Sequence, residues 1–299
     1  MLLRSPKRRL LLLLALVFAA TLAFAACGDD DEEQDGAATP APTEPTITRE
    51  PIDISDAGEL DDGVLTIGSD IAYAPIEFYE EGTTNEKGLD VDIARAMADI
   101  LGVEVEFKQV ADFAGILGDL QASRYDVIMS AISVTPEREM EIDFVVYFGP
   151  VGTGVLTKSG NPEGFQTLED LCGHPVAAQD GTYQIDQMTA LNEGACVDNP
   201  IDIRAFPDNP TAVQELILGR VDAELADDPV AAYGALQSEG ELIELALTGF
   251  ESAEYGIGVR KDSVDLLLAL EEAFQAIVDD GTYLAILEQW GQEQFAYQP

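Results

Sequence analysis

Residues 126–138 read Asp-Val-Ile-Met-Ser-Ala-Ile-Ser-Val-Thr-Pro-Glu-Arg, and they predict a short strand, a turn and the start of a helix. The apolar run near the beginning is typical of a buried strand. Thr135 is a favourable helix N-cap, and Pro136 fits the first helical position, where its missing N–H costs nothing. A strand that leads directly into a helix is the repeating unit of α/β folds.

The same alternation recurs on both sides of this stretch. Short apolar runs predict strands at residues 64–68, 103–110, 126–129, 175–179, 201–206, 222–226 and 256–259. Helical patterns occur at residues 89–101, 116–122, 183–191, 210–218, 229–236 and 264–289, the last broken at Gly281. Strands and helices that alternate in this way indicate an α/β fold with largely parallel sheets.

The arginine at the end of the quoted stretch stands where a helix disfavours a cation. Arg138 is the third residue of the predicted helix, in the turn where the helix dipole favours anions. Ser130 and Ser133 fall in the turn before it. Free N–H groups, two hydroxyls and a guanidinium together suit a carboxylate, which arginine binds through two parallel hydrogen bonds. From this segment alone, an equally good alternative is a surface arginine paired with Glu137, Glu139 or Glu141.

Other polar residues follow predicted strands at the end where open α/β sheets bind ligands. Asp70 follows the first strand, and Thr182 lies just after the strand at 175–179, at an apparent helix start. Asp227 comes before Asp228 and Pro229, which can serve as the N-cap and first residue of the next helix. Asp227 would then be free to bind a ligand, although a second capping carboxylate is an equal alternative. For Thr182 the alternative is ordinary capping.

Taken together, these residues describe a small zwitterion. Arg138 with nearby hydroxyls suits a carboxylate, and an unpaired Asp227 suits an ammonium group, so an α-amino acid satisfies both. Tyr73 and Phe113 lie near the first strand and before the second helix, where an aromatic residue is more often core than ligand platform. No P-loop is present, and Gly-Thr-Gly at 152–154 is too weak to count as a nucleotide fingerprint.

Length and charge limit the remaining choices. A chain of 299 residues has room for two modest domains, and its 46% hydrophobic content can supply their cores. Residues 149–152, Gly-Pro-Val-Gly, interrupt two strand-like runs and are expected to mark one crossing between the domains. The formal net charge of −42 makes nucleic acid and anionic membranes poor partners, because either needs a basic face. A salty or acidic habitat and the steering of cationic ligands are two explanations that composition leaves open.

The N-terminus has the layout of a targeting signal. Residues 1–26 carry basic residues and then an apolar run that ends in Phe24-Ala25-Ala26-Cys27. This looks like a lipoprotein signal peptide whose Cys27 would receive lipid, with Phe24 in place of the usual aliphatic residue. The alternative is an uncleaved membrane anchor. Residues 27–62 are acidic, rich in Pro and Thr and without hydrophobic periodicity, which predicts a disordered tether.

Two further cysteines predict a disulfide. Outside the cytoplasm, Cys172 and Cys196 are most simply paired. The bridge would close a loop of about 25 residues and add roughly 3 kcal/mol in the chain-entropy model. No metal site is expected, and the single histidine, His174, argues against a Ser-His-Asp or Cys-His hydrolase.

Several of these motifs resemble family 3 of the extracellular solute-binding proteins, which serve polar amino acid ABC importers. The resemblance covers about residues 64–292. The stretch 88–94 resembles the family signature, with Leu89 in place of the usual phenylalanine. The segments that are similar to those around the ligand in that family are 70–78, 113–117, 126–138, 179–183 and 222–227. Ala131 and Ala226 depart from the common pattern, and both positions concern recognition of the ligand's side chain.

The resemblance implies a two-lobe, periplasmic-binding-protein-like α/β fold of type II, with the ligand in the cleft between the lobes. It places lobe 1 at residues 63–149 plus 252–299 and lobe 2 at residues 150–251. The ligand-binding residues that it implies are Asp70, Tyr73, Phe113, Ser130, Ser133, Arg138, Gln179, Thr182 and Asp227. One amino acid would then bridge Arg138 on one lobe and Asp227 on the other.

The function implied is the extracytoplasmic substrate-binding component of an ABC importer. We expect it to bind glutamine, arginine, lysine or a similar polar amino acid and to deliver it to the permease subunits. We also expect a monomer without a cofactor, held at the membrane by lipid on Cys27. The alternative is an enzyme similar to the periplasmic cyclohexadienyl dehydratases, which share this fold and would need a general acid in the cleft.

Overall fold

The computed structural model describes residues 52–238 and 242–297. The predicted signal peptide at 1–26, the lipidation site at Cys27 and most of the predicted tether lie outside these ranges. Among the described residues, no helix combines the length and the apolar character that a membrane crossing requires.

Eight strands form the main sheet in the order β5-β1-β6-β11-β7-β10-β8-β9, and β2, β3 and β4 form a small second sheet. The strands of the main sheet are β1 (Val64–Ser69), β5 (Glu104–Gln109), β6 (Val127–Ile128), β7 (Asp143–Lys158), β8 (Pro175–Gln179), β9 (Asp202–Phe206), β10 (Ala223–Asp227) and β11 (Ile243–Val259). The small sheet consists of β2 (Ala72–Tyr73), β3 (Glu77–Tyr79) and β4 (Glu86–Lys87).

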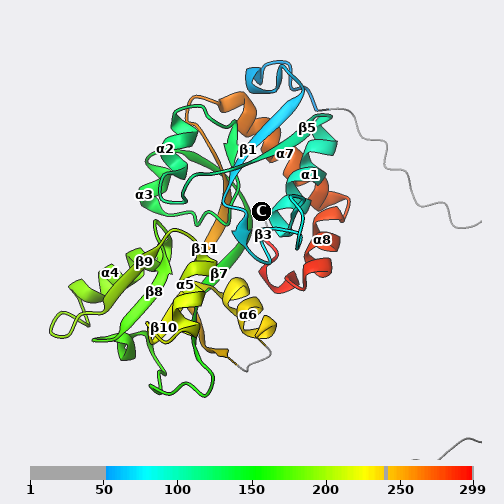
Figure 1. The fold of residues 1–299 in the computed structure, drawn as a ribbon. Helices are drawn as coiled ribbons and strands as arrows, with labels where there is room; N and C mark the ends of the chain where they lie inside the picture. Colours follow the sequence, from blue (N-terminus) through cyan, green and yellow to red (C-terminus); the bar gives the residue numbers. More distant parts are fainter. Residues whose placement is uncertain (1–51, 239–241, 298–299) are drawn as a thin grey trace, which may run out of the picture. The chain divides into compact units, whose positions relative to one another are not determined.

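Helices pack around the main sheet (Figure 1). They are α1 (Leu89–Leu101), α2 (Ile116–Gln121), α3 (Pro136–Glu139), α4 (Tyr183–Glu193), α5 (Asn209–Ile217), α6 (Asp228–Gln237), α7 (Val264–Asp279) and α8 (Thr282–Trp290). Short 3₁₀ turns occur at η1 (Gly58–Leu60), η2 (Leu168–Leu171) and η3 (Glu293–Phe295). Every strand and helix expected from the sequence is found at its place, and the break at Gly281 separates α7 from α8.

The expectation of largely parallel pairing is correct only for the two ends of the main sheet. β5, β1 and β6 pair in parallel, as do β10, β8 and β9. In the middle, β11 runs antiparallel to both β6 and β7, and β7 runs antiparallel to β10. The difference arises because β7 and β11 are long strands that the sequence patterns showed only in part.

Strand β7 runs through the Gly-Pro-Val-Gly stretch that looked like a break. Gly149 has a φ of 106°, a conformation that L side chains rarely adopt, and a Cβ there would lie 3.1 Å from Glu254 Cα on β11. The glycine therefore lets two backbones approach closely while the strand continues. The expected interdomain crossing at this stretch is a passage within one strand rather than a loop.

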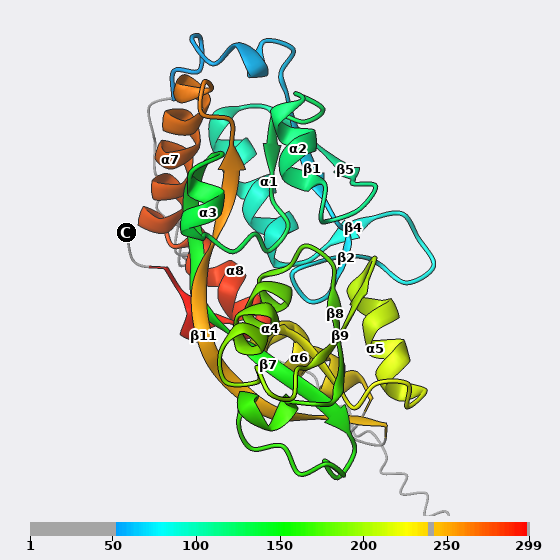
Figure 2. The same cartoon turned by 90° about the vertical axis from the view of Figure 1, so that its left-hand side faces the viewer.

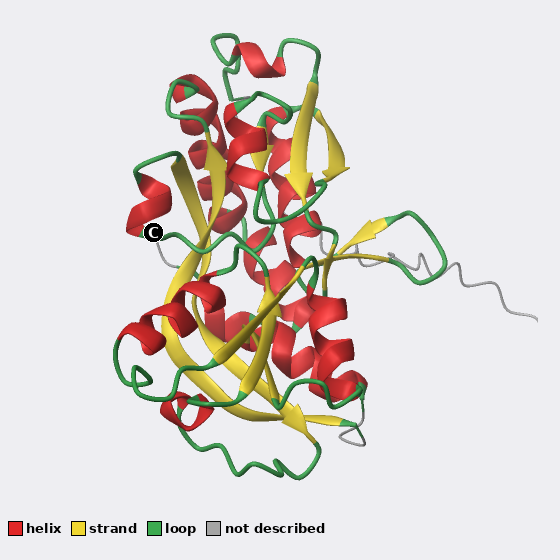
Figure 3. Ribbon diagram, turned by 60° about the vertical axis from the view of Figure 1, so that its left-hand side comes forward, coloured by secondary structure: helices red, strands yellow, loops and turns green. Residues whose placement is uncertain are grey.

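Two groups of elements meet at these long strands. The first group contains β1, β5, β6, the small sheet, α1, α2, α3, α7 and α8, and the second contains β8, β9, β10, α4, α5 and α6 (Figure 1). Figures 2 and 3 show β7 and β11 running side by side through both groups. The proposed lobe boundaries, between residues 149 and 150 and between residues 251 and 252, fall inside these two strands.

The cores follow from the amphipathic helices. On α1, Ile93, Met97 and Leu101 are spaced by four residues, so they share one face of the helix. They are buried together with Leu270 and Phe274 of α7 in the largest hydrophobic cluster. Burial of each such side chain contributes roughly 1.5–3 kcal/mol to folding.

The second group also contains the predicted disulfide. Cys172 and Cys196 are bonded, with their Cα atoms 5.2 Å apart. Cys172 follows η2, and Cys196 lies just after α4 in a separate hydrophobic cluster with Leu171 and Met188. The prediction of this pairing is confirmed.

The interpretation of residues 27–62 as a disordered tether is wrong at its C-terminal end. Ile52, Ala57 and Leu60 are buried in the largest hydrophobic cluster, and η1 forms within this segment. Glu59 accepts hydrogen bonds from Arg260, at 3.0 Å, and from Ser263. The acidic composition of this segment predicted disorder, but its three apolar side chains pack on the first group. Residues 27–51 lie outside the described part of the chain.

Candidate ligand-binding site

Arg138 reaches the site from the first turn of α3. Thr135 accepts a hydrogen bond from the backbone N–H of Arg138 at 3.3 Å, and Pro136 starts the helix, which confirms the predicted cap. The guanidinium donates from Nη1 to the Ser133 carbonyl at 2.8 Å and from Nη2 to the Gly181 carbonyl at 3.1 Å. The second contact joins the two groups.

The electrostatic surroundings of Arg138 contradict the surface-pair alternative. Among the described ion pairs, none includes Arg138, and its acidic neighbours on α3 are exposed. Desolvation lowers the pKa of Arg138, while Asp186 and Asp227 in the second group act in the opposite direction. A partly desolvated guanidinium held only by backbone carbonyls retains capacity for an anion.

Asp227 faces Arg138 from the second group. It occupies the N-cap position of α6, so the expectation that Asp228 would cap this helix is off by one residue. The Asp227 side chain nevertheless makes no capping bond. Its Oδ2 accepts from the Tyr73 hydroxyl at 3.0 Å, and its Oδ1 accepts from Gln184 Nε2 at 2.8 Å. Burial raises the pKa of Asp227, and the hydrogen bonds from Gln184 and Tyr73 oppose that effect.

Asp70 makes a second connection between the groups. Its Oδ1 accepts from Gln109 Nε2 at 2.8 Å, and its Oδ2 accepts from Gln179 Nε2 at 2.5 Å. Gln179 ends β8 in the second group, whereas Asp70 and Gln109 follow or end strands of the first. Burial raises the pKa of Asp70, and the two amide donors oppose that effect.

Ser130 connects Asp70 to a buried acid that the sequence analysis did not single out. The Ser130 hydroxyl donates to Glu77 Oε1 at 2.7 Å and accepts from the Asp70 backbone N–H at 3.0 Å. Glu77 is fully buried, and its Oε2 has no hydrogen-bond partner among the described residues. In the sequence, Glu77 belongs to segment 70–78, which resembles a ligand-bordering motif of the family, and it stands between apolar Ile76 and Phe78.

Glu77 lies close to a second buried acid, Asp90. Asp90 accepts hydrogen bonds from the Tyr147 hydroxyl at 2.6 Å and from the Ala131 backbone N–H at 3.0 Å. Burial raises the pKa of Asp90 to about 7. Burial, together with the charge of Asp90, raises the pKa of Glu77 well above its ordinary value. Both carboxyls therefore favour the protonated form more than an exposed carboxyl does.

The loop before α4 brings further polar groups to the same place. Thr182 stands at the N-cap position of α4 without a capping side-chain bond; its hydroxyl donates to the Gln179 carbonyl at 2.7 Å instead. Gly181 has a φ of 75°, and a Cβ there would lie 2.5 Å from Ala114 Cα of the first group. Only glycine allows this loop to pack so closely against the residue that follows Phe113.

These side chains surround one cavity with about 300 Å³ of space between atoms, part of it open to solvent. Its lining consists of Asp70, Tyr73, Glu77, Phe113, Ser130, Ala131, Ser133, Arg138, Gln179, Thr182, Tyr183, Gln184 and Asp227. All nine residues named from the sequence are among them. The additional ones are Glu77, Ala131, Tyr183 and Gln184. Tyr183 is the last residue of the motif at 179–183, and Gln184 immediately follows it, so their place at this motif was the signal in the sequence.

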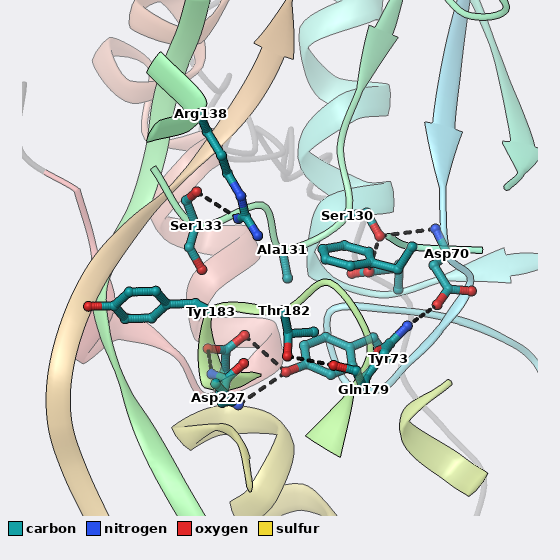
Figure 4. Close-up of a pocket in the computed structure, with 13 residues that line it drawn as sticks. Asp70, Tyr73, Ser130, Ala131, Ser133, Arg138, Gln179, Thr182, Tyr183 and Asp227 are labelled. Atoms are coloured by element: carbon teal, nitrogen blue, oxygen red, sulfur yellow. Dashed lines mark hydrogen bonds between the residues drawn. The ribbon is translucent and has the colours of Figure 1, made fainter. Parts of the chain in front are cut away.

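Figure 4 shows Arg138 extending from α3 on one side of the cavity and Asp227 at the opposite side, next to Thr182 and Tyr73. The lining holds three carboxyls and one guanidinium. A carboxylate and a guanidinium on opposite sides of a cavity can bind a molecule that carries one positive and one negative group. Among residues 52–238 and 242–297, no three His, Cys, Asp or Glu side chains are arranged to hold a metal ion.

The comparisons with known proteins agree with this architecture. Residues 65–293 match the bacterial extracellular solute-binding proteins, family 3, and the chain belongs to this family. The L-cystine-binding protein TcyJ of Escherichia coli is 31% identical, over 76% of this chain and 82% of its own. The arginine-binding protein ArgT of Corynebacterium glutamicum is 34% identical, over 78% of this chain and 75% of its own.

Solved structures show the same fold. An ancestral arginine-binding protein bound to arginine matches with a TM-score of 0.71 and 33% identity, over 76% of this chain and 98% of its own. An ancestral amino acid-binding protein, described as a precursor of cyclohexadienyl dehydratase, matches with a TM-score of 0.67 and 30% identity, over 79% of this chain and 98% of its own. The predicted family and the periplasmic-binding-protein-like α/β fold are therefore confirmed. These relatives are named as binding proteins, which confirms the prediction of a binding protein rather than an enzyme.

Proposed function

We propose that this chain is the substrate-binding component of an ABC importer and that it binds one polar α-amino acid in the cavity between the two groups. The observation that carries the proposal is that Arg138 of the first group and Asp227 of the second line the same cavity. In this proposal the first and second groups are lobe 1 and lobe 2. Their closure around the ligand presents the form that the permease recognises.

The ligand's carboxylate would bind the Arg138 guanidinium, close to the Ser133 hydroxyl and the start of α4 at Thr182. A guanidinium and helix N–H groups are the usual partners of a carboxylate. Its ammonium group would bind Asp227. Because a ligand shifts a conformational equilibrium only through its different affinity for the two states, contacts with both lobes are what would favour closure.

The charges of the cavity favour a ligand with a cationic side chain. Asp70 and Asp227 outnumber Arg138 even when Glu77 is protonated, and a zwitterion adds no net charge. An acidic side chain would increase the carboxylate excess in a desolvated site, whereas a guanidinium or ammonium group would reduce it. Relatives named as arginine-binding proteins support arginine as the first candidate. Asp70 already accepts hydrogen bonds from two side-chain amides, those of Gln109 and Gln179. The amide group of a neutral ligand such as glutamine is a donor of the same kind.

The cellular arrangement is the second part of the proposal. The family consists of extracellular proteins. We propose that Cys27 carries lipid after removal of residues 1–26, that the mature chain is a monomer, and that permease subunits are its protein partners. Replacement of Cys27 by alanine should move the protein from the membrane fraction to the soluble extracytoplasmic fraction. A Cys27→Ala variant that stays with the membrane would contradict lipid anchoring and favour an uncleaved anchor.

A ligand screen tests the binding function. Purified protein is heated with each of the twenty amino acids, and titration calorimetry follows on those that raise the unfolding midpoint. We expect arginine or another polar amino acid to bind, and Arg138→Ala to weaken that binding at least 100-fold, the cost of leaving a buried carboxylate without its partner. Arg124→Ala is the matched control, because Arg124 pairs with Asp119 on the surface. An absence of binding by all twenty amino acids would refute the proposal.

A further inference from the structure

A line of hydrogen bonds runs away from the cavity behind Asp227. Gln184 Nε2 donates to Asp227 Oδ1 at 2.8 Å and to Thr153 Oγ1 at 3.3 Å. The Thr153 hydroxyl donates to Gln187 Oε1 at 2.7 Å. Gln187 Nε2 then donates to the backbone carbonyl of Glu251 at 3.2 Å. Three uncharged side chains thus connect the cavity to β11.

The direction of these bonds is fixed by the number of hydrogens available. The Thr153 hydroxyl has one hydrogen, which it gives to Gln187, so it can only accept from Gln184. Gln184 uses one amide hydrogen for each of its two partners. All three side chains are at most 4% exposed. Water does not reach the bonds among these three side chains, so the loss of one bond leaves a neighbouring group without a partner. The last bond, to the Glu251 carbonyl, is part-buried, because Glu251 itself is exposed.

The far end of the line lies in an irregular part of β11. Thr153 of β7 is opposite Asp227 of β10 on one side and Phe250 of β11 on the other. The pairing register of β11 with β7 shifts between Phe250 and Ala253. Glu251, between them, has a φ of 37°, a left-handed conformation that residues other than glycine rarely adopt. The line therefore ends where the strand departs from regular pairing.

We propose that Gln184, Thr153 and Gln187 are positioning residues that couple Asp227 to the backbone of β11 at Glu251. The proposal rests on the proposed function, in which Asp227 binds the ligand's ammonium group. Because the line contains no cation, it orients the Asp227 carboxylate without neutralising it, and the attraction for an ammonium group is preserved. A ligand whose ammonium group binds this carboxylate would alter the hydrogen bonds of the line that ends at Glu251. The ligand site at Asp227 and the backbone of β11 at Glu251 would then be coupled.

Hydrogen exchange of the ligand-free protein tests the coupling without any ligand. Gln184→Met removes the two bonds at the Asp227 end and does not touch Glu251. We expect amides in the peptide 250–255 to exchange about tenfold faster in this variant. Without its bonds to Asp227 the line stabilises β11 less, and the strand opens locally more often. Thr153→Val should have the same effect, and Thr153→Ser, which keeps the hydroxyl, should restore slow exchange. Thr157→Val is the matched control, since Thr157 is a buried threonine of β7 whose hydroxyl bonds, within the described part of the chain, only to the adjacent Lys158 carbonyl.

Ligand discrimination gives a second readout that a general loss of packing would not change. Arginine and its analogue without the α-amino group, 5-guanidinopentanoic acid, are titrated into the wild type and Thr153→Val. We expect arginine to lose about tenfold in affinity while the analogue loses less than about threefold, because only the ammonium group depends on Asp227.

The possible outcomes separate the two proposals. Unchanged exchange at 250–255 in Gln184→Met and Thr153→Val would overturn the coupling, whether or not the protein binds amino acids. Equal loss of both ligands in Thr153→Val would also overturn it. A wild type that binds no amino acid would refute the proposed function, and hydrogen exchange would still decide whether the line connects Asp227 to β11.

Discussion

The Tyr73 hydroxyl donates a hydrogen bond of 3.0 Å to Asp227 Oδ2, across 154 residues of sequence and between the two groups of elements. The same hydroxyl accepts a hydrogen bond of 3.1 Å from the Asp227 backbone N–H. The two residues are thus joined in both directions. With the Asp70–Gln179 and Arg138–Gly181 contacts, this pair holds the described structure closed at the cavity.

Removing the Tyr73 hydroxyl should therefore favour an open form. In Tyr73→Phe, we expect the ligand-free protein to lose about 1.5–3 kcal/mol of its preference for the closed form, the usual worth of a hydrogen bond to a charged group. Small-angle scattering or a pair of fluorescent labels on the two groups would measure the change. Tyr79→Phe, at an exposed tyrosine, is the control. An unchanged distribution in Tyr73→Phe would show that this bond does not contribute to closure.

Replacing the Asp227 carboxylate should affect binding far more than folding. Asp227→Asn keeps the shape but removes the charge proposed to meet the ligand's ammonium group. We expect a loss of about 2–5 kcal/mol in the free energy of amino acid binding, measured by calorimetry. Asp228→Asn changes the adjacent residue, whose carboxylate accepts from the Gly249 backbone N–H, and should bind nearly as the wild type does. Equal effects in the two variants would contradict the assignment.

The buried acids should make stability depend on pH. Burial raises the pKa of Glu224 to about 8 and that of Asp90 to about 7, and it raises the pKa of Glu77. Since the folded chain keeps protons that the unfolded chain releases, the free energy of unfolding falls as pH rises from about 4 to about 8. Each carboxyl contributes a slope of at most about 1.4 kcal/mol per pH unit.

Denaturant unfolding at pH 5 and pH 8 would measure this dependence. We expect the ligand-free protein to be more stable at pH 5. Glu224→Gln should make the dependence shallower, because a glutamine oxygen can still accept the bond of 2.8 Å from Asn209 Nδ2 without a titrating group. Greater stability at pH 8 would show that these acids do not hold their protons in the folded protein.

The disulfide should stabilise the chain without shaping the cavity. Replacing both Cys172 and Cys196 by alanine is expected to lower the free energy of unfolding by about 3 kcal/mol, from the greater freedom of the unfolded loop. Neither residue lines the cavity, so amino acid affinity should change less than about twofold at temperatures where the variant is folded. The denaturant midpoint and calorimetry give the two values. A large loss of affinity with little loss of stability would contradict this prediction.

The parts of the fold with a clear local signal were predictable from the sequence. Alternating apolar runs and capping residues located the strands and helices, and Thr135 with Pro136 marked a helix start that the structure confirms. The candidate site residues were also recognisable, because ligands of open α/β sheets bind beyond the carboxyl ends of strands. Asp70, Ser130 and Asp227 all satisfy that rule.

The remaining parts depend on contacts that sequence patterns do not reveal. Gly149 and Pro150 are ordinary signs of a turn, so β7 appeared as two pieces although pairing with β11 makes it continuous. Glu77 and Gln184 are buried among residues that lie far away in the sequence, such as Ser130 and Asp227. Residues 52–62 have the composition of a tether, yet a few apolar side chains suffice to pack them. In each case, long-range packing overrides a local preference.

The continuous main sheet has a mechanical consequence. In the described sheet, its two parallel ends connect only through the antiparallel pair β11 and β7. Any rotation of one end relative to the other must therefore be absorbed as elastic twist in two strands, without a flexible loop. The register of this pair shifts repeatedly between Leu245 and Gly256, where the ladder is already interrupted. Bending at those positions sacrifices few backbone hydrogen bonds of the sheet. The stiffness of this ribbon therefore adds to the hydrogen bonds between the two groups at the cavity in setting the work needed to open it.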